Sequence, residues 1–82
     1  MMIFVDVYVP AIDEKYDFEL DEEEKVDTLV REVVSLIEHK EKLNWKPTKN
    51  RFFYDLEREC LLKQEDSLIQ QGVKSGDRLI LI

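Results

Sequence analysis

Two side chains in this 82-residue sequence could supply nucleophilic, acid–base or metal-binding chemistry near neutral pH: the thiol of Cys60 and the imidazole of His39. A metal site needs several thiolate or imidazole ligands, and a nucleophile needs a base placed beside it. The sequence has one cysteine and one histidine, and neither stands next to an evident partner. It contains no recognisable Ser/His/Asp set and no paired carboxylates that would define a cleft. We therefore predict that the protein is not an enzyme and has no metal site.

Both residues have simpler structural interpretations. His39 and Lys40 close a predicted helix, where positive charge complements the negative end of the helix dipole. A lone cysteine cannot form an internal disulfide, so Cys60 is predicted to be a small buried hydrophobic residue in a reducing compartment. Gly72 and Gly76 are the only glycines, which is too few for a loop that cradles phosphate. We predict no cofactor.

Composition and charge narrow the classes of partner. The chain is 44% hydrophobic and 38% charged, as expected of a folded globular protein, and its length suits one domain, residues 1–82. The net charge of −7 argues against nucleic acid, because phosphate binding needs a clustered basic surface. No apolar run approaches the roughly 20 residues of a membrane span, and the first residues lack a signal-peptide pattern. We expect a cytoplasmic protein that does not insert into a membrane.

The charge is distributed unevenly along the chain. Residues 1–38 carry 12 acidic and 3 basic side chains, whereas residues 39–51 carry 1 acidic and 5 basic ones. The basic loop from Lys40 to Arg51 can be a solvated segment that offsets the acidic first half, or a docking loop for a partner. Trp45 within it is predicted to pack beneath the loop, with projection toward a partner as the alternative.

Hydrophobic periodicity predicts a hairpin followed by a helix. Residues 3–9 alternate apolar and polar side chains, and residues 15–20 do so again after a break at Pro10, which predicts two antiparallel strands. Their shared core face comprises Ile3, Val5, Val7, Val9, Tyr16, Phe18 and Leu20. Between residues 26 and 37 the apolar spacing changes to three and four, which predicts a helix that covers the hairpin and lacks a good N-cap. The apolar stripe of this helix is Val26, Leu29, Val30, Val33, Val34 and Ile37.

The rest of the chain predicts short strands and turns. Residues 51–55 form a predicted third strand, residues 60–62 a short fourth strand and residues 66–69 a helical turn. The sequence ends in four consecutive apolar residues that follow a glycine-bearing turn. Such a run predicts a strand in the middle of the sheet, and we expect positive φ angles at both glycines.

This order of elements resembles the β-grasp fold of ubiquitin, an α+β fold in which a mixed sheet of four to five strands packs on one helix. The residues that carry the resemblance are Met1, Ile3, Phe4 and Val5; Tyr16, Asp17, Phe18 and Leu20; Cys60; Ser67 and Leu68; and the run from Gly72 to Leu79. Within that fold, these motifs are similar to those of the YukD-type ubiquitin-like proteins of type VII secretion systems in Gram-positive bacteria. The basic loop has no counterpart in the family pattern.

The resemblance implies an accessory protein that binds components of a secretion machine. Ubiquitin and the β-grasp sulfur carriers react through a free C-terminal diglycine, whereas this sequence closes on bulky branched residues that end at Ile82. We therefore expect a protein that is not conjugated to others. One alternative is a sulfur carrier or modifier with a trimmed C-terminus. Another is a ubiquitin-like regulatory subunit of an unrelated multi-component enzyme.

The pleat of the last strand suggests where partners would bind. If Leu79 and Leu81 face the helix, Ile80 and Ile82 point to the opposite face of the sheet. We predict that they meet Phe4 there, and Phe53 as well if Phe52 and Tyr54 point inward. The predicted partner-binding patch is Phe4, Phe53, Ile80 and Ile82. The Leu43–Trp45 loop or a second copy of the chain could instead cover this patch.

Overall fold

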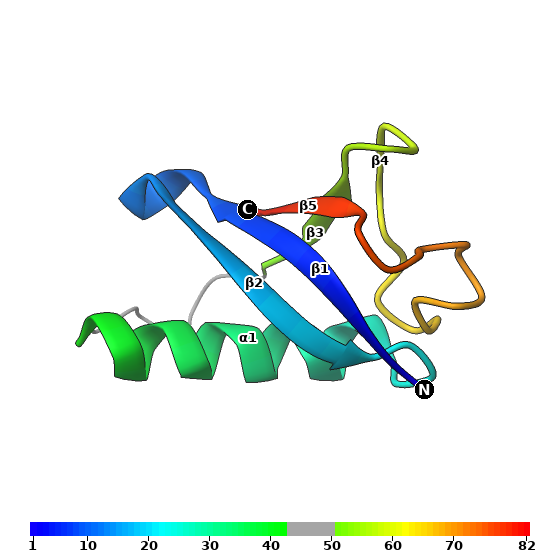
Figure 1. Ribbon diagram of the computed structural model, residues 1–82, viewed down its shortest axis with the longest axis horizontal. Helices are drawn as coiled ribbons and strands as arrows, with labels where there is room; N and C mark the ends of the chain where they lie inside the picture. The colour runs from blue at the N-terminus through cyan, green and yellow to red at the C-terminus, as the bar shows by residue number, and fades with distance from the viewer. Residues whose placement is uncertain (43–50) are drawn as a thin grey trace.

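The computed structural model describes residues 1–42 and 51–82 of the chain (Figure 1). Its elements are β1 (Met2–Val9), a 3-10 helix (Pro10–Ile12), β2 (Glu14–Asp21), α1 (Val26–Glu41), β3 (Phe53–Asp55), β4 (Cys60–Leu61) and β5 (Arg78–Leu81). The strands form one sheet in the order β2-β1-β5-β3-β4, and α1 lies across one face of it. The predicted α+β β-grasp arrangement is confirmed. No helix in the described ranges is both long and apolar enough to cross a membrane.

The last strand occupies the centre of the sheet, as its apolar run predicts. β5 pairs in parallel with β1 on one side and antiparallel with β3 on the other. β1 pairs antiparallel with β2 over eight residues, which confirms the predicted hairpin. The turn that leads into β5 has positive φ at Gly72 (79°) and Gly76 (93°), as expected of the only glycines in the sequence.

The core lies between α1 and the inner face of the sheet. The predicted inward residues of β1 are all buried, and so is the stripe of α1 except for Val34, which is half-buried. Tyr16 and Phe18 are only partly buried, because β2 is an edge strand. The helix begins without a side-chain N-cap. Backbone carbonyls replace it: the N–H of Val26 donates to Asp66 at 2.9 Å, and the N–H of Asp27 donates to Gln64 at 3.0 Å.

The predicted facing of the third strand is wrong. Phe53 has no exposed surface and Phe52 and Tyr54 are half-buried, so the inward and outward residues are the reverse of those predicted. The reason is Asp55, a fully buried carboxylate at the end of β3. It accepts hydrogen bonds from the Glu57 N–H at 2.9 Å and from Arg58 Nη1 at 3.0 Å. Because these partners satisfy the charge, an acidic residue can face inward, and Phe53, two residues earlier, shares its face.

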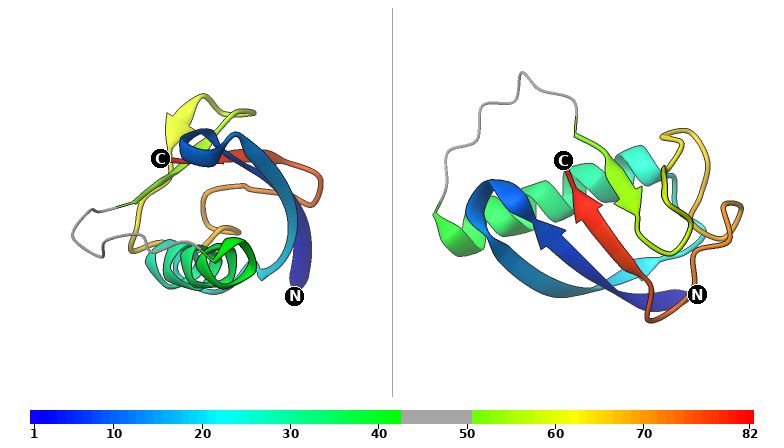
Figure 2. Two further views of the ribbon diagram at one scale, coloured as in Figure 1. Left: turned by 90° about the vertical axis from the view of Figure 1, so that its left-hand side faces the viewer. Right: turned by 90° about the horizontal axis from the view of Figure 1, so that it is seen from above.

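Other short-range predictions also differ from the structure. Cys60, predicted to be buried, is exposed, because β4 is a two-residue edge strand that lies far from α1 (Figures 1 and 2). Leu62, just beyond β4, is buried in its place. Residues 66–69 do not form a helix: Asp66 lies in a bend, Ser67 forms an isolated bridge with Lys25, and residues 68 and 69 lie in turns. The predictions for Trp45 and most of the basic loop concern residues 43–50, which lie outside the described residues.

Candidate protein-interaction surface

The face of the sheet turned away from α1, here called the outer face, is seen from above in Figure 2 (right). An apolar row crosses four strands of this face. In this row Leu61 of β4 lies opposite Tyr54 of β3, Tyr54 lies opposite Ile80 of β5, and Ile80 lies beside Tyr8 of β1. Directly opposed residues of paired strands bring their side chains together on one face. Leu61 is 51% exposed and the other three are half-buried.

A second pair extends this row toward the end of β5. Phe52 and Ile82 exchange two backbone hydrogen bonds, at 2.8 and 2.9 Å, and are therefore directly opposed. Alternation along β3 and β5 places both on the outer face, where Ile82 is 48% exposed. We call the combined surface the outer patch. Its residues are Tyr8, Phe52, Tyr54, Leu61, Ile80 and Ile82.

The structure brings together only part of the predicted patch. Ile80 and Ile82 lie on the outer face, as predicted, whereas Phe53 is in the core. Phe4 is 59% exposed but lies elsewhere, opposite Glu19, and its carbonyl accepts a hydrogen bond from Gly76 at 2.7 Å. The residue of β1 beside Ile80 is Tyr8, four positions further on, or about 13 Å along a strand. The grouping of Phe4 with the two isoleucines is therefore wrong.

Four members of the outer patch were not among the predicted site residues. Alternation in β1 does place Tyr8 on the same face as Phe4, so its orientation could be predicted from the sequence. Which of the two meets β5 depends on the parallel register, for which a single sequence carries no signal. Phe52 and Tyr54 were missed because the facing of β3 was reversed, and Leu61 was missed because β4 is so short.

Charged groups border the outer patch on the side nearer the start of β5. Arg78 Nε lies 3.0 Å from Glu57 Oε2, and this pairing lowers the pKa of Glu57 and raises that of Arg78. Asp6 of β1 lies beside Arg78, and Asp17 of β2 lies opposite Asp6. The hydrogen bond and the negative charge of Asp6 raise the pKa of Asp17. A depression of about 180 Å³ lies at this boundary. It is lined by Asp6, Val7, Tyr8, Lys15, Leu56, Arg78, Leu79 and Ile80.

One arginine holds the segments that frame the outer patch. Arg58 Nη1 contacts Asp55 at 3.0 Å and Asp77 at 2.9 Å, and its other terminal nitrogen donates to the carbonyl of Gly72. Asp77 also accepts the N–H of Lys74 at 2.9 Å. The turn after β3 and the turn before β5 are thus joined through a single guanidinium, whose fork of donors suits this role.

The part of the chain that the structure describes contains no cluster of metal ligands. Within residues 1–42 and 51–82, no three His, Cys, Asp or Glu side chains are gathered as metal ligands. His39 and Lys40 lie in the last turn of α1, where the sequence places them, and complement the helix dipole. The candidate site is the outer patch, an apolar surface with a charged border.

No protein-family model matches the chain, and no curated protein matches it. Several solved structures are similar to it. The ubiquitin-like domain of the Mycobacterium tuberculosis type VII secretion protein EccD1 has a TM-score of 0.78 at 16% identity, covering 100% of this chain and 98% of that one. A chain of the MycP5-free ESX-5 inner membrane complex scores 0.81 at 17% identity, over 99% of this chain and 20% of that one. Caldiarchaeum subterraneum ubiquitin scores 0.74 at 19% identity, over 100% and 92%. At such identities the similarity establishes the ubiquitin-like fold alone.

Proposed function

We propose that this ubiquitin-like chain acts by binding other proteins through the outer patch, as a cytoplasmic accessory component of a type VII secretion system of the YukD type. It is not an enzyme in this proposal, and it takes no cofactor. The observation that carries the proposal is the apolar row of Leu61, Tyr54, Ile80 and Tyr8 on the face that α1 leaves uncovered.

The composition of the outer patch supports a recognition role. Large apolar and aromatic side chains that gather on one face, bordered by charges, are typical of protein interfaces, in which tyrosine is enriched. The border of Asp6, Arg78 and Glu57 offers both signs of charge for orienting a partner. The backbone of Ile82 is hydrogen-bonded to Phe52, so the chain is held in the sheet up to this residue. Binding at this surface therefore requires no free tail.

The similar structures favour secretion as the setting. One of them is described as a ubiquitin-like domain of a type VII secretion protein, and another is a chain of an inner membrane complex. We transfer from them only the class of partner, a protein component of the secretion machine.

Binding to purified secretion components tests the proposal. We expect the soluble domain of a type VII secretion membrane ATPase from the same organism to bind it in a surface plasmon resonance assay. Ile80→Asp should weaken that binding roughly 30-fold, the effect of losing an interface residue worth about 2 kcal/mol. Phe4→Asp is the matched control, because Phe4 is exposed and apolar but lies outside the outer patch. Equal losses in both variants, or no binding by the unmodified chain, would contradict the proposal.

A further inference from the structure

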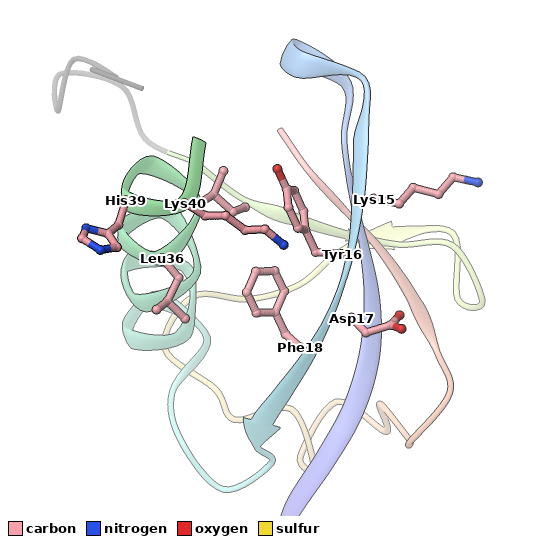
Figure 3. Close-up of a pocket in the computed structure, with 8 residues that line it drawn as sticks. Lys15, Tyr16, Asp17, Phe18, Leu36, His39 and Lys40 are labelled. Atoms are coloured by element: carbon pink, nitrogen blue, oxygen red, sulfur yellow. The ribbon is translucent and has the colours of Figure 1, made fainter. Parts of the chain in front are cut away.

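A groove of about 450 Å³ separates the edge strand β2 from the C-terminal half of α1 (Figure 3). Tyr16 and Phe18 point into it from β2, and Leu36 and Lys40 point into it from α1. Leu36 is 56% exposed, although it is a large apolar residue on a helix. The rings of Tyr16 and Phe18 lie 5.8 Å apart and are only partly buried. The groove is therefore an open trough in which the apolar surfaces of Phe18 and Leu36 lie beside charged side chains such as Lys40.

The wall of the groove is held in place by polar contacts at its end. The hydroxyl of Tyr16 donates a hydrogen bond to Glu41 Oε2, and Lys40 Nζ lies 5.2 Å from the centre of the tyrosine ring. Burial, followed by the hydrogen bond to Glu41, raises the pKa of Tyr16 to about 12. The hydrogen bond joins β2 to the last turn of α1 at this end of the groove.

The backbone beside the groove offers free hydrogen-bonding groups. In the β1–β2 ladder, hydrogen-bonded and non-hydrogen-bonded pairs of residues alternate. The Glu22 N–H donates to the Met1 carbonyl at 3.0 Å, so this pair is hydrogen-bonded, and the Asp6 N–H donates to Asp77 at 3.0 Å, away from β2. It follows that even-numbered residues of β2 bond to β1, whereas Lys15, Asp17 and Glu19 turn their N–H and C=O groups outward. β2 is the outermost strand of the sheet, so within the described ranges these groups have no strand to pair with. Such an edge can accept an added strand.

The charges along the β2 edge favour an added strand with basic side chains. Figure 3 shows Lys15 and Asp17 pointing away from the groove, and alternation places Glu19 on their side. Asp17 stands directly opposite Asp6, and the negative charge and hydrogen bond of Asp6 raise its pKa. An added strand would set its own side chains beside Asp17 and Glu19. Basic side chains would relieve the repulsion, and the residues between them would point over the groove.

We propose that the β2 edge and its groove bind an extended segment of a partner protein in which apolar residues alternate with lysine or arginine. The backbone of the segment pairs with Lys15, Asp17 and Glu19, its apolar side chains rest on Phe18 and Leu36, and its basic side chains face the carboxylates. A second copy of this chain fits less well, because pairing β2 with β2 would bring the carboxylates of two copies together. This site adjoins the border of the outer patch at Lys15 and Asp17, but its groove lies on the helix side of the sheet.

Short synthetic peptides test the inference with the whole chain. We use three labelled, end-capped hexapeptides: alternating Val and Lys, alternating Val and Glu, and a Val/Lys peptide of the same composition without alternation. The alternating Val/Lys peptide should bind at least tenfold more tightly than either of the others in fluorescence anisotropy. Equal binding of the two Val/Lys peptides would overturn the proposal, since it would show attraction to net charge alone.

Two sets of variants measure separately how much the apolar groove and the acidic side chains contribute to peptide binding. Leu36→Asp should weaken the Val/Lys peptide at least tenfold, although it adds a negative charge that would strengthen a purely electrostatic attraction. Ile69→Asp is the matched control, because Ile69 is 51% exposed and lies in a turn outside the groove; it should leave affinity unchanged. Asp17→Lys combined with Glu19→Lys should reverse the preference in favour of the Val/Glu peptide. Tighter or unchanged binding by Leu36→Asp, or an unreversed preference, would overturn the proposal.

Peptide N-methylation tests the backbone pairing itself. In an antiparallel arrangement the lysine amides of the peptide face β2, whereas in a parallel one the valine amides do so. Methylating one of these two sets should therefore abolish binding and methylating the other should not, which also gives the strand direction. Equal effects of both sets would show that no strand is added to β2.

Discussion

The two faces of β5 hold side chains of almost the same chemistry in very different surroundings. Leu79 and Leu81 are 0% and 1% exposed, whereas Ile80 is half-buried and Ile82 is 48% exposed. The difference arises from the pleat alone, because α1 covers only one face of the sheet. The comparison teaches that an aliphatic run in a domain of this size need not all serve the core. Its outward half is available for recognition.

The sharpest test of this contrast is a charge on the inner face. Leu81→Asp would place an unpaired carboxylate among the buried residues of the core, and its desolvation exceeds what a small domain can tolerate. We expect this variant to be unfolded at 25 °C. Loss of the cooperative thermal transition in circular dichroism would confirm it. A folded Leu81→Asp variant would mean that the faces of β5 are reversed.

Helix α1 allows the same contrast to be measured with smaller changes. Leu29 is 2% exposed, whereas Leu36 is 56% exposed on the same helix. Leu29→Ala should lose about 2–4 kcal/mol of unfolding free energy, because it leaves a cavity in the core. Leu36→Ala is the control and should stay within about 0.5 kcal/mol of the unmodified chain. Urea denaturation measures both, and similar midpoints for the two variants would refute the assigned core face.

Ile80→Asp tests the outer face of β5. The side chain lies on the outer face between Tyr54 and Tyr8, where water can reach a carboxylate. We expect the variant to fold and to lose no more than about 1 kcal/mol of unfolding free energy, because the change lies on the surface. Its main effect should be the loss of partner binding. A thermal melt beside that of Leu81→Asp gives the answer. Unfolding of both variants would remove the distinction between the faces.

The smallest expected effect concerns the acidic pair at the border of the outer patch. Asp6 raises the pKa of Asp17, so the folded state binds a proton there more tightly than the unfolded state does. Stability at this position therefore increases as pH falls through the pKa of Asp17. Asp17→Asn should raise the melting temperature slightly at pH 7, and this difference should vanish in acid. Glu19→Gln is the control for removing one negative charge from β2, because Glu19 lies opposite Phe4 and not opposite a carboxylate.

The parts of the fold that sequence could predict are those governed by a local period. The alternation of Ile3 to Val9 and the helical spacing from Val26 to Ile37 specify which side chains are buried, and the structure confirms them. The last strand was predictable in the same way, since four apolar residues follow Gly76 and the turn.

The errors arise where side-chain contacts or the register between strands, and not a local period, determine which way a side chain faces. Asp55 faces inward because Arg58 and backbone N–H groups satisfy its charge, and no period in the sequence indicates this. That reversal buries Phe53 and exposes part of Tyr54. The neighbour of Ile80 depends on the register between β1 and β5, strands that are far apart in the chain. The predicted patch consequently contains Ile80 and Ile82, which lie on the outer face, and Phe53, which lies in the core.

The central claim is that the outer patch of β5 and its neighbours binds a protein partner, and NMR chemical-shift mapping tests it most directly. The ¹⁵N-labelled chain is titrated with the soluble domain of the secretion membrane ATPase. We predict that the largest amide shift changes occur at Tyr8, Tyr54, Leu61 and Ile80, with little change at Phe4. Changes centred on Phe4 or on α1, or a spectrum that does not change, would contradict the account.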